Sequence, residues 1–255
     1  MGFEFAAATD VGRKRDHNED ALLVLPEHNV AVVCDGMGGH DAGEVASGIG
    51  VETVRRFFEL AGDLEATWPF RYDRSKDEGT NLLSVAAQWA NQRIREATDA
   101  GGNTAGKRGM GTTFVGCVVR GRKAWFGWVG DSRGYVFRRG ELHATTQDHS
   151  LLNELIRTGR LSEEEIENFQ HKNVITRALG MADQMEVDVS SWDLEPGDVC
   201  MVCCDGLTGM VPDARIAEIL SQEQDLQAAC QRLVDEANEA GGVDNITVAL
   251  VRYSA

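Results

Sequence analysis

The sequence predicts an α+β fold in which two antiparallel β-sheets are stacked face to face and covered by helices. Segments rich in β-branched and aromatic residues come in pairs and triplets, separated by tight turns such as "RGRK" at 120–123 and "RRGEL" at 138–142. Such spacing predicts antiparallel hairpins and meanders. Helical segments are grouped between these clusters, whereas a parallel βαβ sheet alternates single strands with helices. The grouping therefore favours stacked antiparallel sheets.

The strand segments are identified by β-branched and aromatic content and by the Gly, Pro or Asp residues that separate them. They are "FEFAAAT" (3–9), "ALLVL" (21–25), "VAVVCD" (30–35), "TTFVGCVVRG" (112–121), "KAWFGWVGD" (123–131), "GYVFRRG" (134–140), "MEVDVSSWDL" (185–194), "DVCMVCCD" (198–205) and "NITVALVRY" (245–253). The periodicity of apolar residues predicts helices over 42–60, 81–98, 148–158, 213–221 and 225–240. A capping box formed by Ser162 and Glu165 predicts a further helix start.

The whole chain, residues 1–255, is expected to form a single domain. The least periodic stretches, 61–80 and 99–111, are interpreted as a surface excursion and a glycine-rich loop. Neither marks a domain boundary, because the chemistry described below needs residues from both sides of each. The formal charge of −16 argues against binding to nucleic acid or to an anionic membrane, both of which attract basic surfaces.

The residues at the start of the chain, "MGFEFAAATDVGRKRD", lack the apolar segment of a signal peptide. No run approaches the roughly 18 apolar residues of a membrane span, so we expect a cytoplasmic protein without membrane insertion. The six cysteines lie mostly in apolar runs and are expected to be buried thiols. The C-x-x-C spacing within "CMVCC" at 200–204 has no second pair, which favours a buried strand over a zinc site.

Four aspartates share one local environment at the ends of predicted strands. Asp35 follows "VAVVC", Asp131 follows "AWFGWVG", and Asp205 follows "VCMVCC". Asp244 lies just before the strand "NITV". A single aspartate at such a place is commonly a turn former or an N-cap. Together with the acids of "NED" at 18–20, however, these residues give six carboxylates that stacked sheets can bring to one edge.

So many carboxylates cannot all remain ionised at close range without cations, because like charges raise one another's pKa. All-oxygen clusters favour Mg²⁺ and Mn²⁺, and two such ions about 3.5–4 Å apart can hold a hydroxide for in-line attack on phosphorus. The chain has neither a Walker-type phosphate loop nor a Gly-x-Ser-x-Gly nucleophile. An activated water is therefore favoured over a side chain as the nucleophile.

A series of motifs along the chain resembles, in order, those of the PPM/PP2C-type metal-dependent Ser/Thr protein phosphatases, most closely the compact bacterial members. The motifs are "TDVGRKRDHNEDA" (9–21), "VVCDGMGGHDAGEVAS" (32–47), "GMGTTFVG" (109–116), "VGDSRGYVF" (129–137), "TQDHSLLNELIRTGRLSEEE" (146–165), "NVITRALG" (173–180), "CCDGLTGMV" (203–211) and "GGVDNITV" (241–248). Each motif alone is weak, but the ordered set spans 5 to 252 and is very specific. The resemblance implies a four-layer α-β-β-α sandwich, a metal centre at one edge of the two sheets, and a flap region at 146–180.

When the family's residue roles are matched position by position, the resemblance implies a set of metal ligands in this chain. Asp35 bridges two Mn²⁺ or Mg²⁺ ions, and the carbonyl group of Gly36 binds one of them. Glu19 resembles a ligand of that same metal, either direct or through water, and Asp20 resembles the residue that holds a metal-bound water.

Other motif positions complete the implied site. Asp205 and Asp244 match the ligands of the other metal, and Asp131 matches the acid that binds, together with Asp205, a third and weaker metal. Arg15, in the Arg-x-x-x-Glu-Asp spacing, matches the phosphate-binding arginine, and its guanidinium suits a phosphate dianion. Arg13 is interpreted as an exposed basic residue. The resemblance thus implies catalytic roles for Arg15 and for the aspartates at 35, 205 and 244.

The sequence does not identify the general acid. Animal relatives carry a histidine two residues after the bridging aspartate, where this chain has Met37. His40 is either the proton donor or a turn-stabilising residue, and a metal-bound water is a further alternative. His149 is interpreted as part of the flap region next to Asp148, the expected N-cap of a helix.

The resemblance implies a Mg/Mn-dependent phosphatase of phosphoserine and phosphothreonine in proteins. One alternative is a phosphatase of another phosphoester, and a second is a catalytically silent regulatory module on the same fold. The silent module is disfavoured because such a module loses metal-binding acids, and every expected acid is present. The implied partners are phosphorylated proteins, a bacterial Ser/Thr kinase among them, and a monomer is expected.

Overall fold

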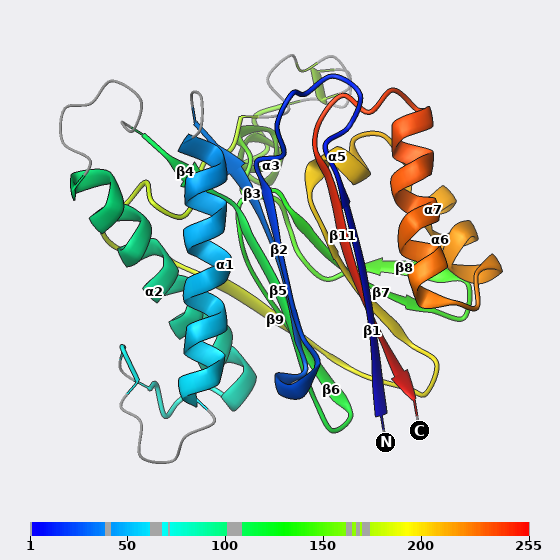
Figure 1. Cartoon of the computed structure of the whole chain (residues 1–255), viewed down its shortest axis with the longest axis horizontal. Helices are drawn as coiled ribbons and strands as arrows, with labels where there is room; N and C mark the ends of the chain where they lie inside the picture. Colours follow the sequence, from blue (N-terminus) through cyan, green and yellow to red (C-terminus); the bar gives the residue numbers. More distant parts are fainter. Residues whose placement is uncertain are drawn as a thin grey trace.

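The protein is a sandwich of two antiparallel sheets with two helices packed on each outer face (Figure 1). The computed structural model describes residues 2–38, 42–61, 68–70, 72–100, 109–161, 165–166, 169 and 174–254. Helices α1 (Ala42–Ala61) and α2 (Glu78–Ala100) cover one sheet. Helices α6 (Asp213–Gln222) and α7 (Leu226–Glu239) cover the other. This arrangement confirms the predicted four-layer α-β-β-α sandwich.

The first sheet has the strand order β1-β11-β10-β7-β8. Its strands are β1 (Gly2–Asp10), β7 (Arg133–Arg138), β8 (Glu141–Ala144), β10 (Val199–Cys203) and β11 (Ile246–Ser254). Strands β1 and β11 pair along their whole length, from Gly2 opposite Ser254 to Asp10 opposite Ile246. The two ends of the chain therefore lie side by side at one end of the molecule (Figure 1).

The second sheet has the strand order β2-β3-β5-β6-β9, with the short strand β4 also paired to β3. Its strands are β2 (Asp20–Leu25), β3 (Val30–Met37), β4 (Gly111–Thr112), β5 (Phe114–Arg120), β6 (Lys123–Val129) and β9 (Asp188–Asp193). A single 3-10 turn, η1 (Pro26–His28), joins β2 to β3. Asn29 closes this turn with a φ of 53°, the left-handed conformation that asparagine tolerates better than most residues.

Three apolar layers hold the sandwich together. One lies between the two sheets, one between the second sheet and helices α1 and α2, and one between the first sheet and helices α6 and α7. Their fully buried side chains include Phe126 and Val202 between the sheets, Phe57 and Leu83 under the first helix pair, and Tyr135 and Leu233 under the second. Burial of these side chains is the main favourable term in folding.

Glycine allows helix α2 to approach its sheet closely. A β-carbon on Gly79 would overlap the indole ring of Trp125 on β6, and one on Gly127 would lie 2.8 Å from the β-carbon of Leu83. Neither glycine has a positive φ, so the requirement at both positions is for space and not for an unusual backbone conformation. Trp125 and Trp128 are both buried and contribute to the core.

Some element boundaries differ from those predicted. The segment 112–121 divides at Thr113 into β4 and β5, and β8 was predicted only as part of a hairpin turn. The strand predicted over 198–205 ends at Cys203, and Asp205 begins the short helix α5 (Asp205–Thr208).

The N-cap predicted before the helix of the flap region is wrong. Helix α3 (Leu151–Arg157) is capped by Ser150, whose hydroxyl accepts a hydrogen bond from the amide of Asn153. Asp148 instead forms a bidentate ion pair with Arg133, at 2.7 and 2.8 Å, and so cannot serve as the cap. Residues 162–164, where a further helix start was predicted, lie outside the described residues.

None of the helices among the described residues is long and apolar enough to cross a lipid bilayer.

We expect Gly79→Ala to destabilise the protein by about 1–3 kcal/mol, the usual cost of overpacking a filled core. A matched control is Gly48→Ala on α1, where a β-carbon meets nothing within 4 Å and the substitution should stabilise by about 0.4–1 kcal/mol. Urea unfolding followed by circular dichroism measures both free energies of unfolding. Equal effects of the two substitutions would contradict the packing described for α2.

Candidate metal centre

The predicted carboxylates meet at one edge of the sandwich because the antiparallel register places several strand ends there. Asp20 at the start of β2 is directly opposite Asp35 near the end of β3. In the other sheet, Cys203 at the end of β10 pairs with Val248 near the start of β11. Asp205 and Asp244 therefore lie at the same edge, next to the turn after β6 that carries Asp131.

Asp35 lies within β3 and not at its end as predicted, because Gly36 and Met37 continue the strand and pair with β4. Hydrogen bonds hold both the amide and the carbonyl group of the Asp35 main chain. Its amide donates to the hydroxyl of Thr113 (3.0 Å), and its carbonyl oxygen accepts from the Thr113 amide (2.8 Å) and the Thr112 hydroxyl (2.9 Å). These bonds fix the direction in which the carboxylate points.

Asp20 is linked to the other sheet through Thr247 of β11. The Thr247 hydroxyl donates a hydrogen bond to Oδ2 of Asp20 at 2.6 Å. Burial raises the pKa of Asp20 to about 6, while contacts with Thr247 and Cys204 partly offset this effect. Oδ1 of the same carboxylate is buried, and no hydrogen-bond partner for it occurs among the described residues.

Glu19 and Gly36 lie against each other at the start of β2. The carbonyl oxygen of Glu19 accepts hydrogen bonds from the Gly36 amide (3.1 Å) and the Ser47 hydroxyl (2.6 Å). A β-carbon at Gly36 would collide with the carbonyl oxygens of Glu19 and Gly43, so only glycine fits there. Burial raises the pKa of the Glu19 carboxyl group, and the charge of Arg15 lowers it.

Asp205 at the start of α5 and Asp244 in the loop before β11 approach each other at Gly206 of α5. A β-carbon at Gly206 would overlap the carbonyl oxygen of Asn245 and lie 3.4 Å from the β-carbon of Asp244, so this glycine lets α5 touch the loop before β11. Oδ1 of Asp244 accepts a hydrogen bond from the Asn245 amide at 2.8 Å. Burial raises the pKa of Asp205, and the nearby charge of Asp244 raises it further.

Arg15 reaches this cluster from the loop after β1. Its guanidinium forms an ion pair with Oδ2 of Asp244 at 2.7 Å, and its side chain is about half exposed (48%). An exposed cation next to the carboxylates is free to meet an anionic group from solvent. Arg13 is exposed, and its amide bonds the carbonyl oxygen of Gly242 (2.7 Å), in agreement with its interpretation as a surface residue.

Asp131 follows β6 in a turn that Gly130 makes possible with a φ of 112°. Burial raises the pKa of Asp131 to about 7, with further contributions from the charges of Asp205 and Asp148. His149 supports this turn. Its Nδ1 accepts from the Gly130 amide at 3.1 Å, and its Nε2 lies 2.9 Å from Oδ2 of Asp188. Both ring nitrogens of His149 are therefore occupied by structural contacts.

The electrostatics of the cluster centre on Asp35. Burial raises its pKa well above the ordinary value, and the charges of Asp20, Asp205, Asp244 and Asp131 raise it further, in that order. An array of carboxylates that disfavour one another's charge is the environment in which a divalent cation binds most strongly. The predicted acids are thus brought together, and their oxygen donors fit Mg²⁺ or Mn²⁺.

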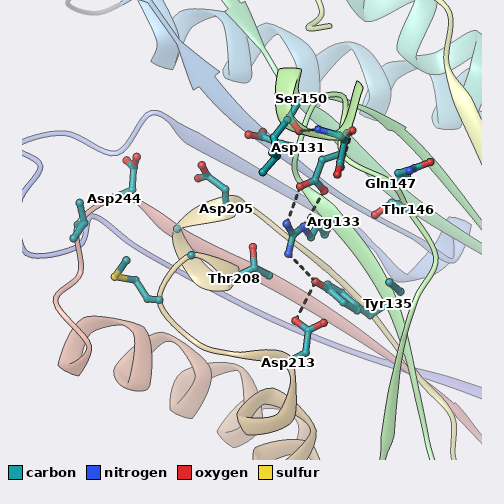
Figure 2. A pocket seen from close by; sticks show the side chains of 18 residues that line it. Asp131, Arg133, Tyr135, Thr146, Gln147, Ser150, Asp205, Thr208, Asp213 and Asp244 are labelled. Carbon is teal, nitrogen blue, oxygen red and sulfur yellow. Dashed lines mark hydrogen bonds and ion pairs between the residues drawn. The ribbon is translucent and has the colours of Figure 1, made fainter. Parts of the chain in front are cut away.

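A cavity of about 540 Å³ opens beside the carboxylates. Figure 2 shows Asp131, Asp205 and Asp244 along part of its lining, with Tyr135 and Asp213 farther along it. Arg133 lies between these groups and donates to Asp148 as well as to the Tyr135 hydroxyl at 3.4 Å, which in turn donates to Asp213 at 3.3 Å. The cavity can admit a side chain that carries a group to the carboxylates.

Some supporting residues have roles that the sequence did not specify. The side-chain oxygen of Asn245 accepts from the Glu19 amide (2.8 Å), and its NH₂ group donates to the carbonyl oxygens of Val11 and His17, both at 2.9 Å. Asn245 therefore anchors the loop that carries Arg15. Thr247 received no prediction, because a threonine inside a strand is too common to signal a contact with Asp20.

His40, one of the alternatives for the general acid, lies outside the described residues. Met37 is partly buried at the end of β3, where it pairs with Gly111. All six cysteines are buried free thiols, which confirms that prediction.

Comparison with known proteins was consistent across sequence and structure. The family model described as "Protein phosphatase 2C" matches residues 9–246. The serine/threonine phosphatase Stp of Listeria innocua is 36% identical over 252 residues, which are 95% of this chain and 93% of that protein. The protein phosphatase PhpP of Streptococcus pneumoniae is 36% identical over 251 residues, which are 97% and 96% of the two chains.

A solved structure resembles this fold over almost its whole length. The catalytic domain of the serine/threonine protein phosphatase PstP, crystallised in complex with two manganese ions, superposes with a TM-score of 0.81. The two sequences are 29% identical, and the match covers 99% of each chain.

We expect the metal-free protein to lose stability as the pH rises from about 4 to about 7. The pKa of Asp20 is raised to about 6 and that of Asp131 to about 7, from the ordinary aspartate value of 3.8, so the folded state binds more protons than the unfolded state within this window. Each such group contributes a slope of up to about 1.4 kcal/mol per pH unit. Denaturant unfolding in EDTA at a series of pH values measures this slope.

Asp131→Asn should flatten the upper part of this pH dependence. The matched control is Asp213→Asn, which removes an exposed carboxylate from the same cavity. Because a bound divalent cation offsets the repulsion between carboxylates, adding Mn²⁺ should stabilise the protein more at pH 8 than at pH 5. A metal-free stability that is constant or increasing between pH 5 and 7 would contradict the electrostatic description.

Proposed function

The chain belongs to the protein phosphatase 2C family and is a Mn²⁺- or Mg²⁺-dependent protein serine/threonine phosphatase, and on this premise we propose how its residues hold the metals and the phosphate. Asp35 would hold two ions, and the carbonyl group of Gly36 and the side chain of Glu19 would help to hold one of them. Asp20 orients a water ligand of that ion. The observation that carries this assignment is the convergence of Asp20, Asp131, Asp205 and Asp244 on Asp35, whose pKa their charges raise.

The remaining acids complete the proposed ligand set. Asp205 and Asp244 hold the other ion, and Asp131 with Asp205 holds a third, weaker one. Support for this grouping comes from the lining of the cavity, to which all three residues contribute. When bound, the ions supply an activated water as the nucleophile for attack on phosphorus.

Arg15 is the proposed phosphate-binding residue. Its ion pair with Asp244 holds the guanidinium beside the carboxylate cluster and partly exposed to solvent. There it can present two parallel N–H donors to a phosphate dianion. A guanidinium so placed also neutralises negative charge that grows on the equatorial oxygens during transfer. Asn245 keeps Arg15 in place indirectly, because it binds the main chain of the Arg15 loop at Val11 and His17.

No described histidine is assigned as the general acid. The contacts of His149 with Gly130 and Asp188 occupy both of its ring nitrogens. Nδ1 must be unprotonated to accept from an amide, so His149 is held as the tautomer that donates from Nε2 to Asp188. It serves to hold the Asp131 turn.

The substrates are phosphorylated proteins. We propose that they include the autophosphorylated form of an opposing Ser/Thr kinase, which this enzyme dephosphorylates. We also propose that the protein acts as a monomer in the cytoplasm. Six free, buried cysteines suit a reducing compartment.

The two alternatives are not favoured. A silent module has no use for the full set of carboxylates, all of which are retained here. A phosphatase of small metabolites would share the two-metal chemistry, yet the curated relatives at 36% identity are named protein phosphatases.

We expect release of phosphate from phosphoserine and phosphothreonine peptides that depends on Mn²⁺ or Mg²⁺ and is abolished by EDTA. Small phosphorylated metabolites, offered at the same concentration, should be hydrolysed with a lower kcat/KM. Malachite-green measurement of free phosphate compares the two classes of substrate. A higher kcat/KM for a metabolite would support the alternative phosphoester instead.

Arg15→Ala should lower kcat/KM for a phosphopeptide by about 10- to 100-fold, since a charge-assisted hydrogen bond is worth about 1.5–3 kcal/mol. The matched control is Arg13→Ala, which removes an exposed arginine two residues away and should leave kcat/KM within about 2-fold of the wild type. Equal losses in both variants would indicate a general electrostatic effect and contradict the assignment of Arg15.

A further inference from the structure

The cavity beside the metal centre extends to a carboxylate that the centre does not use. Asp213, the first residue of α6, is exposed and lines this cavity of about 540 Å³. Figure 2 shows its carboxyl group facing the hydroxyl of Tyr135, which donates a hydrogen bond to Oδ1 at 3.3 Å. Burial raises the pKa of Tyr135, so the hydroxyl keeps the proton that it donates. A neutral group therefore holds Asp213 in place and leaves its negative charge uncompensated.

The other acids that line the cavity already have cationic partners. Three of them are the proposed metal ligands Asp131, Asp205 and Asp244. Asp148 forms the bidentate ion pair with Arg133. Among the residues that the structure describes, Asp213 is the carboxylate of this lining that has neither role. The part of the cavity next to Asp213 therefore stays negatively charged even when the metals are bound.

The same cavity has apolar side chains in its lining. They include Met210, which is partly buried, and Val243, which is exposed. Lysine and arginine side chains pack their aliphatic stems along apolar surface while the charged group reaches a polar partner, and methionine adapts to such stems. Apolar walls together with one uncompensated carboxylate suit a basic side chain and disfavour an acidic one.

The path of the chain limits the distance between the metal centre and this carboxylate. Tyr135 follows Asp131 by four residues, on β7 and the turn before it, so their main chains are at most about 14 Å apart. An extended substrate covers the same distance in about four residues. A side chain within that span of the phosphorylated residue can therefore reach Asp213.

We propose that Asp213 is a specificity-determining residue that binds a lysine or arginine within about four residues of the phosphoserine or phosphothreonine. The proposal rests on the function proposed above and names a class of substrate for it, phosphoproteins with basic side chains close to the phosphorylated residue. The ammonium or guanidinium group forms an ion pair with the carboxylate of Asp213, and no covalent bond changes at this contact.

The test measures kcat/KM of the full chain with Mn²⁺ for phosphothreonine peptides whose flanking residues are alanine except at one position. That position carries lysine, acetyl-lysine or glutamate and is moved from four residues before the phosphothreonine to four after it. Acetylation removes the charge of lysine and keeps the stem, so the ratio of kcat/KM for lysine to that for acetyl-lysine isolates the charge. The variants are Asp213→Asn and Asp213→Lys. The matched control is Asp235→Asn, an exposed aspartate of α7 outside this cavity.

In the wild type, lysine should raise kcat/KM by about 2- to 5-fold over acetyl-lysine at one or more positions, the effect of a partly exposed ion pair. The gain should lie in KM, because a contact away from phosphorus is made equally in the bound substrate and in the transition state. Asp213→Asn should abolish the preference, Asp213→Lys should reverse it in favour of glutamate, and Asp235→Asn should keep the wild-type ratio.

Equal kcat/KM for lysine and acetyl-lysine at every position, or a lysine preference that survives in Asp213→Lys, would overturn the proposal. Metal-dependent hydrolysis of the all-alanine peptide would still support the proposed function in either case. Failure of the wild type to hydrolyse any of the peptides would overturn both.

Discussion

Repulsion between carboxylates at one edge of the sandwich is the constraint on which the rest of the structure depends. Asp35 is surrounded by Asp20, Asp131, Asp205 and Asp244, and burial together with their charges raises its pKa. Such an arrangement does not form by itself, and the three apolar layers of the sandwich supply the free energy that holds it. The fold therefore keeps the acids together, and divalent cations neutralise them when bound.

The site belongs to both sheets, so its geometry depends on how the sheets pack. Thr247 on β11 donates to Asp20 on β2, and Asn245 just before β11 accepts from the amide of Glu19 just before β2. These hydrogen bonds cross from one sheet to the other at the edge where the metals are proposed to bind. A shift between the sheets would separate Asp20 and Glu19 from Asp244, and the core between the sheets prevents it.

The layers and the cluster were predictable because their signals are local. Strand composition and hairpin spacing identify the sheets, and glycine or serine follows three of the four clustered aspartates, at 35, 131 and 205. Contacts between distant segments carried no such signal, as at Thr247, which is 227 residues from Asp20. Asp148 fits an N-cap in sequence, but the guanidinium of Arg133 is a stronger partner for it and Ser150 takes the cap. Asp205 was placed at a strand end because "VCMVCC" is uniformly apolar and does not show where the strand stops.

The most direct test of the central claim is the stoichiometry of Mn²⁺ binding when the shared carboxylate is neutralised. Isothermal titration of metal-free wild type should show two tightly bound ions, the number that a bridging carboxylate joins in a two-metal site. Asp35→Asn keeps the shape of the side chain but removes its charge, and it should lose tight binding of both ions together. Retention of one ion at wild-type affinity would contradict the central position of Asp35, and retention of both would contradict the account of the metal centre.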